Sequence, residues 1–360
     1  MPDWSQSMQQ TFEFYKVNAF TWQDTELLKY VKSCSITWDL TAETLGSATF
    51  DIDEEIGETY IRVYLITIQN GVREKFELGT FLVQTLPSSF DGKKHKYNCE
   101  AYTPLLELKE KYPPLGYFLP KEATNIMSSA FTSARENMRA PVIRAINNKT
   151  LFEDYVADPS DTWLETIRNL VTKANYEMAF DSNTRLTFTP KREIESLTPI
   201  WTYDDGNSSI LYPEVDSEKD LYGIPNVVEI YATSGANVFH SVAENNEVSS
   251  PVSIKNRGRK IIHRETDPEI MGGIPTNYDE GKQYVDDYAE RVLKNLSSIE
   301  NTITYEHGYC PVRVGDCVRI NYSKAGLFNI RAKVISQTIK CEPGCPVTER
   351  AIYTTKFYGG

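Results

Sequence analysis

The stretch that decides the fold runs from Tyr284 to Phe357, and it begins Tyr284-Val-Asp-Asp-Tyr-Ala-Glu-Arg-Val-Leu-Lys-Asn-Leu296. Its apolar residues recur every three or four positions, which is the spacing of a helix that packs along one face. Three stretches that alternate between apolar and polar residues follow, at 303–305, 318–322 and 328–334. Alternation with a period of two indicates strands, and Gly315-Asp316 marks a tight turn between the first two. One helix followed by a β-meander predicts a small α+β unit.

The N-terminal part of the chain carries strand patterns of the same kind. Apolar residues alternate within residues 33–38, 49–52 and 60–68. Asn70-Gly71 follows the last of these stretches, and this dipeptide is the strongest short signal for a β-hairpin. Another strand pattern runs from Lys96 to Tyr102. Residues 33–103 are therefore predicted to form a sheet or barrel of about five or six strands.

A helix followed by a hairpin is predicted in the middle of the chain. Residues 161–174 carry the apolar stripe of a one-sided helix, and Thr162 with Glu165 fits a capping box. Residues 176–188 then alternate on either side of a short turn, which indicates two paired strands. The rest of the middle is predicted as a helix interrupted near Pro141, within residues 121–150, and as loops at residues 200–222 and 261–280.

Composition places the chain among globular proteins. It has 360 residues, of which 40% are hydrophobic and 24% are charged, and this length is typical of about two to three domains. No run approaches the ~18 apolar residues of a membrane-spanning helix, so no membrane insertion is expected. The first ten residues lack the basic and apolar parts of a signal peptide, which predicts folding in a cytoplasm. The net charge of −12 argues against nucleic-acid binding as the main function, because phosphates attract Lys and Arg.

Four of the six cysteines stand near the C-terminus, and they leave three alternatives open. Six residues separate Cys310 from Cys317, and three residues, including Pro-Gly, separate Cys341 from Cys345. Paired cysteines suit a structural zinc site, although the first spacing is longer than usual. A disulfide between Cys341 and Cys345 would suit an oxidising setting. Free buried thiols are favoured, because disulfides are rare in cytosolic proteins.

The sequence presents no set of catalytic, cofactor-binding or metal-binding residues. Its four histidines stand outside His-Glu-x-x-His and Gly-x-Ser-x-Gly contexts. The acid pairs Asp53/Glu55 and Asp204-Asp205 could serve hydrolysis or hold a hard cation, but solvated turns explain both. The basic cluster Arg257–Lys260 could hold a phosphate or an acidic partner, but such a cluster more often marks an exposed turn. We therefore expect no cofactor and no enzymatic activity.

Several short motifs follow one another in an order that carries a resemblance. They are Tyr102–Leu108 before a helical insertion, Leu186–Pro190 at the end of the helix and hairpin, Asn226–Val228, Ser250–Ser253, Gly258-Arg259 and Val314–Ile320. This order resembles the hub proteins of bacteriophage baseplates. The same fold appears in tail-associated proteins of long-tailed phages and in the N-terminal part of type VI secretion spike proteins. The resemblance covers roughly Phe12 to Tyr358.

The resemblance implies an α+β, β-rich fold with two tube-like β-barrel domains on either side of a mixed α/β middle. The implied bounds are 1–105 for the N-terminal tube-like domain, 106–280 for the helical insertion and mixed domain, and 281–360 for the C-terminal helix and tube-like domain. It also implies a homotrimer, in which two related barrels per chain form a pseudo-six-fold ring around a channel.

Such a ring would be a structural hub with several partners in the virion. It would join the hexameric tail tube protein to a central spike or tail-tip protein, and it would contact other baseplate proteins. Phage DNA would pass through the channel without specific binding, which suits an acidic chain. The protein would be assembled in the host cytoplasm and end in the tail baseplate.

Two other functions stay open beside the structural hub. Tyrosine is abundant, with 22 residues, and aromatic faces with polar tips suit contacts with sugars. The chain could therefore be a carbohydrate- or receptor-binding tail module. A hydrolase that uses Asp53 with Glu55 ranks last, because nothing else in the sequence supports catalysis.

Overall fold

The computed structural model describes residues 2–85, 87–90, 92–93, 95–121, 124–147, 149–151, 153–218, 221–268 and 274–359. The chain forms two compact units, and each unit draws on separate parts of the sequence. The first contains Met1–Val215 with Thr304–Ala351, and the second contains Asp216–Ile303 with Ile352–Gly360. These bounds differ from those of the three domains predicted from the sequence. The predicted domains stay a prediction, with the bounds 1–105, 106–280 and 281–360.

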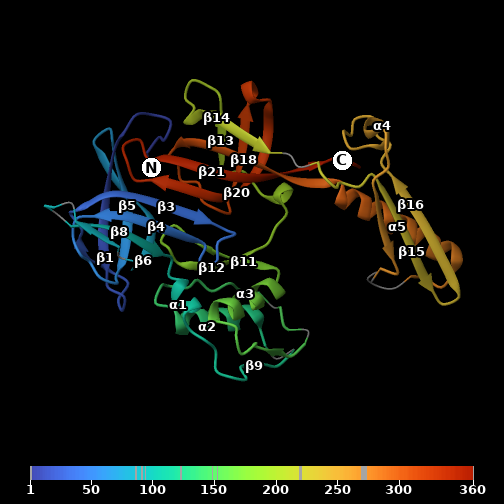
Figure 1. The fold of residues 1–360 in the computed structure, drawn as a ribbon, viewed down its shortest axis with the longest axis horizontal. Helices are drawn as coiled ribbons and strands as arrows, with labels where there is room; N and C mark the ends of the chain where they lie inside the picture. The colour runs from blue at the N-terminus through green and yellow to red at the C-terminus, as the bar shows by residue number, and fades with distance from the viewer. Residues whose placement is uncertain are drawn as a thin grey trace. The chain divides into compact units, whose positions relative to one another are not determined.

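Most of one large sheet belongs to the first unit (Figure 1). Its N-terminal strands are β1 (Gln9–Val17), β2 (Asp24–Leu27), β3 (Val31–Asp39), β4 (Gly46–Ile52), β5 (Tyr60–Gln69), β6 (Val72–Thr85), β7 (Ser88–Phe90) and β8 (His95–Tyr102). Its later strands are β13 (Trp201–Asp204), β14 (Leu211–Glu218), β18 (Ser298–Gly308), β19 (Cys317–Tyr322), β20 (Leu327–Lys340) and β21 (Pro346–Lys356). The order is β14-β18-β21-β20-β3-β4-β8-β6-β5-β1-β2, with β19 on β20, β13 on β19 and β7 on β8. The described strand pairs form no closed barrel.

The two ends of the chain meet where β3 pairs with β20. The pairing is antiparallel, with Ile36 opposite Ile339 and Trp38 opposite Gln337. Figure 1 shows β3 in blue beside β20 in red. Ile36 and Ile339 are both buried, so the apolar alternation of each strand continues across the joint. Strands at both ends were predicted from their pattern, and the structure adds that they belong to one sheet.

Two predicted turns are confirmed. Asn70 and Gly71 have φ values of 52° and 80°, as a two-residue hairpin turn requires, and Gln69 pairs with Val72 across them. In the second turn the amide of Asp316 donates to the carbonyl of Arg313 at 3.0 Å, with Gly315 at a φ of 96°. Glycine suits this position because its positive φ is strained for other residues.

A small helical layer completes the first unit. It contains α1 (Leu106–Lys109), α2 (Ile126–Asn137), α3 (Trp163–Lys173), the ribbon β9 (Phe118–Leu119) with β10 (Tyr155–Val156), the hairpin β11 (Tyr176–Phe180) with β12 (Leu186–Pro190), and the 3-10 turn η1 (Ile194–Ser196). The predicted capping box is confirmed, because the Thr162 amide donates to Glu165 at 2.7 Å and the Glu165 amide donates back at 3.3 Å. The helix expected within residues 121–150 is shorter than its pattern suggested. It ends at Asn137, ahead of Pro141, which cannot continue a helix.

The second unit has a separate core. Its sheet has the order β16 (Asn237–Glu244), β15 (Val227–Ser234) and β17 (Ile262–Thr266), and helix α5 (Tyr278–Leu296) covers one face. The short helix α4 is Ile254–Arg257. Ile230, Phe239, Val285 and Leu293 are fully buried in this core. Gly281 lets α5 approach the sheet, because a Cβ there would lie 2.6 Å from the Phe239 ring.

Two predictions about helix bounds and loops need correction. Helix α5 starts six residues before Tyr284, because the Asn277 side chain accepts hydrogen bonds from the amides of Asp279 and Glu280 and caps an earlier turn. The loops predicted at 200–222 and 261–280 are wrong where β13, β14 and β17 form; residues 219–220 and 269–273 lie outside the described residues. These strands depend on partners far away in the sequence, and local composition does not reveal such partners.

Candidate functional site

The acids that the sequence singled out take part in local structure. Asp53 forms an ion pair with Lys32 at 2.6 Å, and Glu55 is exposed. Asp204 accepts a hydrogen bond from a turn amide two residues later. Asp205 accepts one from the Ser323 hydroxyl, at 2.6 Å. The structure thus gives each a turn or surface role and brings neither pair to a cleft.

The basic cluster Arg257–Lys260 is also tied into its own unit. Arg257 donates to the carbonyls of Leu221, at 2.8 Å, and Ile224, at 2.9 Å. Lys260 forms an ion pair with Glu244. These contacts fix a turn, which is the commoner role for such a cluster.

A fully buried carboxylate, that of Glu349 on β21, lies at the centre of a polar cluster in the first unit. Its Oε2 accepts hydrogen bonds from the hydroxyls of Tyr203, at 3.2 Å, and Tyr305, at 2.7 Å. Its Oε1 accepts one from Nε2 of Gln337, at 2.8 Å, and lies 3.4 Å from Nε2 of His307. Strands β13, β18, β20 and β21 each contribute a residue, so the cluster holds four strands together.

The contacts of His307 indicate that it is protonated. Its Nδ1 donates to the carbonyl of Gly308 at 2.7 Å, because a carbonyl can only accept. Its Nε2 lies 3.0 Å from the Tyr203 hydroxyl and 3.4 Å from Oε1 of Glu349, and a proton on Nε2 would serve both contacts. Burial is the largest single effect and lowers the pKa of His307, but the charge of Glu349 and the hydrogen bonds with Cys310 and Glu349 together outweigh it and raise the pKa to about 10. Burial likewise opposes the charge of Glu349, and the charge and hydrogen bonds around it still lower its pKa.

The cluster is closed to solvent and therefore positions strands rather than a substrate. Glu349, His307 and Tyr305 are between 0% and 1% exposed. One signal in the sequence points to this cluster, because Glu349 stands between Val347 and Ala351 at the inward positions of a strand. A charged residue at such a position needs partners. The identity of the partners could not be read from the sequence, because Tyr203 lies in a stretch that reads as a loop.

The cysteines of the C-terminal region occupy three different surroundings. Cys310 contacts the polar cluster through its Sγ, and Cys317 is buried on β19. Cys341 lies beside Cys34 of β3, and its amide donates to the Cys34 carbonyl at 2.9 Å. Cys345 is fully buried at the end of the predicted turn. Within the described part of the chain, no three Cys, His, Asp or Glu side chains come together to hold a metal ion, so the zinc alternative finds no ligand set there.

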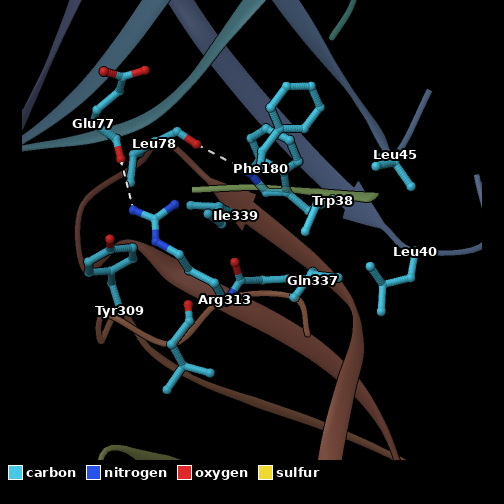
Figure 2. A pocket seen from close by; sticks show the side chains of 13 residues that line it. Trp38, Leu40, Leu45, Glu77, Leu78, Phe180, Tyr309, Arg313, Gln337 and Ile339 are labelled. Atoms are coloured by element: carbon cyan, nitrogen blue, oxygen red, sulfur yellow. Dashed lines mark hydrogen bonds between the residues drawn. The ribbon is translucent and has the colours of Figure 1, made fainter. Parts of the chain in front are cut away.

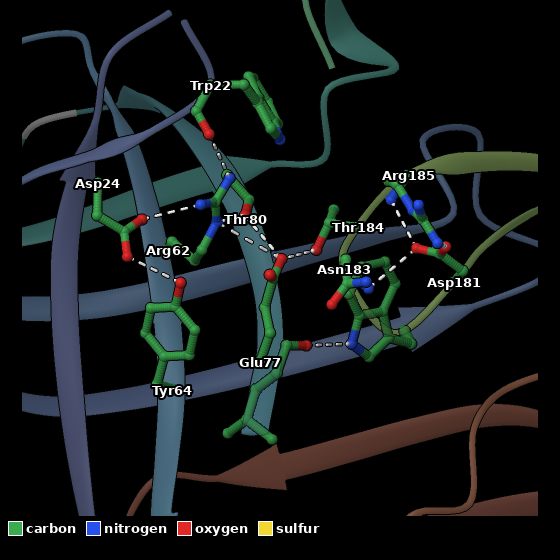
Figure 3. Close-up of polar contacts among 12 residues, drawn as sticks. Trp22, Asp24, Arg62, Tyr64, Glu77, Thr80, Asp181, Asn183, Thr184 and Arg185 are labelled. Atoms are coloured by element: carbon green, nitrogen blue, oxygen red, sulfur yellow. Dashed lines mark hydrogen bonds and ion pairs between the residues drawn. The ribbon is translucent and has the colours of Figure 1, made fainter. Parts of the chain in front are cut away.

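A second network joins the N-terminal strands to the hairpin β11–β12 (Figure 3). Arg62 on β5 donates to Asp24, at 2.8 Å, and to the Thr80 hydroxyl, at 2.9 Å. Glu77 on β6 accepts from Thr80, at 3.1 Å, and from Thr184 in the hairpin turn, at 2.7 Å. Burial raises the pKa of Glu77, although the charge of Arg62 and the two hydroxyls oppose the shift. The network fixes the hairpin against the sheet.

A cavity lies between the same elements (Figure 2). Trp38, Leu78, Phe180, Arg313 and Gln337 are among its lining residues, so β3, β6, β11 and β20 all border it. The indole of Trp38 donates to the Leu78 carbonyl at 3.2 Å. The volume of this cavity, about 30 Å³, has room for water but is far below the several hundred Å³ of a typical ligand pocket.

A shallow hollow beside α2 is larger, at about 380 Å³. The rings of Tyr117 and Trp163 meet edge to face there, with centroids 5.0 Å apart. The other lining residues are mostly polar, among them Ser128, Thr132 and Glu136. Aromatic edges beside hydroxyls and a carboxylate could contact a polar ligand such as a sugar.

No helix in the described ranges has the length and apolar character needed to cross a membrane.

Comparison with known proteins places this fold among tail proteins. No protein-family model matches the chain, and no curated protein sequence matches it. The solved prophage MuSo2 43 kDa tail protein from Shewanella oneidensis superposes with a TM-score of 0.60 at 11% identity, over 96% of this chain and 98% of that chain. The tail protein from Neisseria meningitidis MC58 gives a TM-score of 0.58 at 12% identity, over 95% and 96% of the two chains. The resemblance is thus confirmed at the level of the fold, and this chain has the fold of these two tail proteins.

Proposed function

We propose that this chain is a structural component of a phage tail and forms the central hub of its baseplate as a homotrimer. The observation that supports the proposal is the likeness of fold to a prophage tail protein over 96% of this chain and 98% of that chain. Function still belongs to sites and surfaces rather than to a fold, so the proposal needs its own test.

The trimer would have two tube-like domains per chain, built from residues 1–105 and 281–360, with residues 106–280 outside them. Three copies would then present six similar domains, and such a ring would fit a six-fold tail tube protein on one side and a central spike or tail-tip protein on the other. Heterologous contacts between identical chains close into rings when the rotation allows it. Strands β14 and β2, at the ends of the described strand order, leave edges that such contacts could cover.

Mass measurement in solution tests the oligomeric state. Light scattering over a concentration series should reach three times the chain mass of 41.1 kDa. Purified particles should contain the chain, and an epitope tag should place it where the tail tube ends. A chain that stays monomeric at high concentration and is missing from particles would overturn the proposal.

The hollow beside α2 keeps a carbohydrate- or receptor-binding role as the second candidate. A glycan array probed with the full chain would find the sugar, and calorimetry would measure its affinity. Tyr117→Ala should abolish binding, whereas Tyr112→Ala should not, because Tyr112 is exposed but does not line the hollow. Equal binding by both variants, or silence of the array, would remove this candidate.

A further inference from the structure

Cys34 and Cys341 face each other at the end of the β3–β20 ladder. The last pair of that ladder is Lys340 opposite Ser35. One step further, the amide of Cys341 donates to the carbonyl of Cys34 at 2.9 Å. The two cysteines are therefore direct neighbours across the joint between the two ends of the chain.

Antiparallel geometry places this pair within reach of a covalent bond. Residues that are opposite and hydrogen-bonded in antiparallel strands have Cα atoms about 5.5 Å apart. Disulfides most often span about 5.5–6 Å between Cα atoms. Opposite residues also point to the same face of the sheet, so the two side chains lie on one side of the ladder.

We propose that Cys34 and Cys341 close to a disulfide under oxidising conditions and so join β3 covalently to the end of β20. The sequence suggested a different bond, between Cys341 and Cys345. The strand register favours Cys34, since the ladder already places it directly opposite Cys341. Cys345 follows a turn and has a φ of 40°, which is a left-handed backbone conformation. A bond from Cys345 to Cys341 would have to form without changing this conformation.

The reaction is a thiol–disulfide exchange with a small disulfide such as oxidised glutathione. The thiolate of Cys341, which is more exposed than the 6% of Cys34, attacks one glutathione sulfur and releases the first glutathione thiolate. The thiolate of Cys34 then attacks Sγ of Cys341 in the mixed disulfide and releases the second. Two cysteine thiols thereby lose two electrons and two protons, and one glutathione disulfide becomes two thiols.

The surroundings of Cys341 set the conditions for this reaction. The hydrogen bond with Cys34, followed by burial, raises the pKa of the Cys341 thiol. Only a small fraction is then thiolate at neutral pH, so closure should be slow and should accelerate as the pH rises. The chemistry does not depend on a role in a tail. In a tail protein the bond would form after release from a reducing cytoplasm.

Peptide mapping of the full chain gives the decisive test. The protein is incubated with oxidised glutathione at pH 8, with dithiothreitol in a parallel sample, and digested without reduction. We expect a linked peptide containing Cys34 and Cys341 in the first sample only. A bond between Cys341 and Cys345, or glutathione adducts without any internal bond, would overturn the proposal.

Thermal melting adds an independent readout with matched variants. Closing a loop of roughly 300 residues should raise the Tm by several degrees, because long loops lose the most chain entropy. The shift should vanish in Cys34→Ser and persist in Cys99→Ser, which changes another buried cysteine of the same sheet. If Cys34→Ser does not fold, Cys345→Ser still decides, since it should keep the linked peptide. The two proposals can fail separately. A trimer that never forms the bond would overturn only the disulfide proposal, and a chain that forms the bond but never enters particles would overturn only the tail function.

Discussion

Glu349 shows how much one side chain can hold in place. Four side chains direct polar groups at its two carboxylate oxygens, and the Glu349 side chain is fully buried from solvent. A buried charge of this kind costs free energy when it is left without partners. The same holds for His307, which carries the matching positive charge. The Glu349–His307 pair is therefore stable while both partners are present, and removal of either partner should lower the free energy of unfolding.

Removal of the carboxylate should destabilise the first unit strongly. Glu349→Ala leaves His307 and three hydrogen-bond donors without their acceptor, and we expect a loss of about 3–5 kcal/mol in the free energy of unfolding. Glu342→Ala, at an exposed position of the nearby turn, should change the free energy by less than about 0.5 kcal/mol. Urea unfolding of both variants measures the difference. Equal stability would show that the cluster adds nothing.

The pH dependence of stability should reveal the charge on His307. Its pKa is about 10 in the fold and 6.5 without it, so the stability it adds is complete below pH 6.5 and is lost as the pH rises towards 10. The part due to Glu349, whose pKa is lowered, is present above pH 4.5 and lost as the pH falls through the folded pKa. The Tm difference between the wild type and His307→Gln should therefore shrink from pH 6 to pH 10. A constant difference would mean that His307 is neutral throughout.

At the scale of elements, local signals explain the helices and hairpins best. The stripe and capping box of α3 are complete within 14 residues, 161–174, so the sequence alone predicts that helix. The hairpin turn at Asn70-Gly71 is equally local. Strands β13 and β14 have no such signal, because Asp, Gly and Ser surround them and their partners lie about a hundred residues away. The partners of Glu349 could not be predicted for the same reason, since Tyr203 lies on β13.

A bulge on β6 offers a test of packing in one element. The register shifts where Gly79 lies opposite Val63, and a Cβ on Gly79 would lie 2.5 Å from the Phe81 ring. Gly79→Ala should therefore cost about 1–3 kcal/mol in the free energy of unfolding through overpacking. Gly308→Ala is the matched control, because it is also a strand glycine and its Cβ would meet nothing within 4 Å. Urea unfolding should show a loss in the first variant only, and a similar loss in both would argue against overpacking.

The whole molecule contains two units with separate cores. Leu293 lies in the core of the second unit and is fully buried, whereas the core around α2 and α3 belongs to the first. Separate cores allow one part of a protein to open without the other. The division into 1–105, 106–280 and 281–360 stays a prediction, and it came from a resemblance that carries no information about contacts.

Hydrogen exchange should detect this separation. Leu293→Ala removes a buried side chain from α5 and should cost about 2–5 kcal/mol in the second unit. Amides of β15 and β16 should then exchange faster, while those of α3 in the first unit keep their wild-type rates. Leu296→Ala, at an exposed position of the same helix, should leave both sets unchanged. Acceleration in both units by Leu293→Ala would show that they unfold together.

The pairing of β3 with β20 also has a consequence during synthesis. Asp39 leaves the ribosome roughly 300 residues before its partner Ser336 exists. At about 5–20 residues per second, the outer edge of β3 waits roughly 15–60 s for its neighbour. An open strand edge can pair with other nascent chains in that interval. Slower translation should therefore lower the soluble yield of this protein, and co-expressed chaperones should restore it.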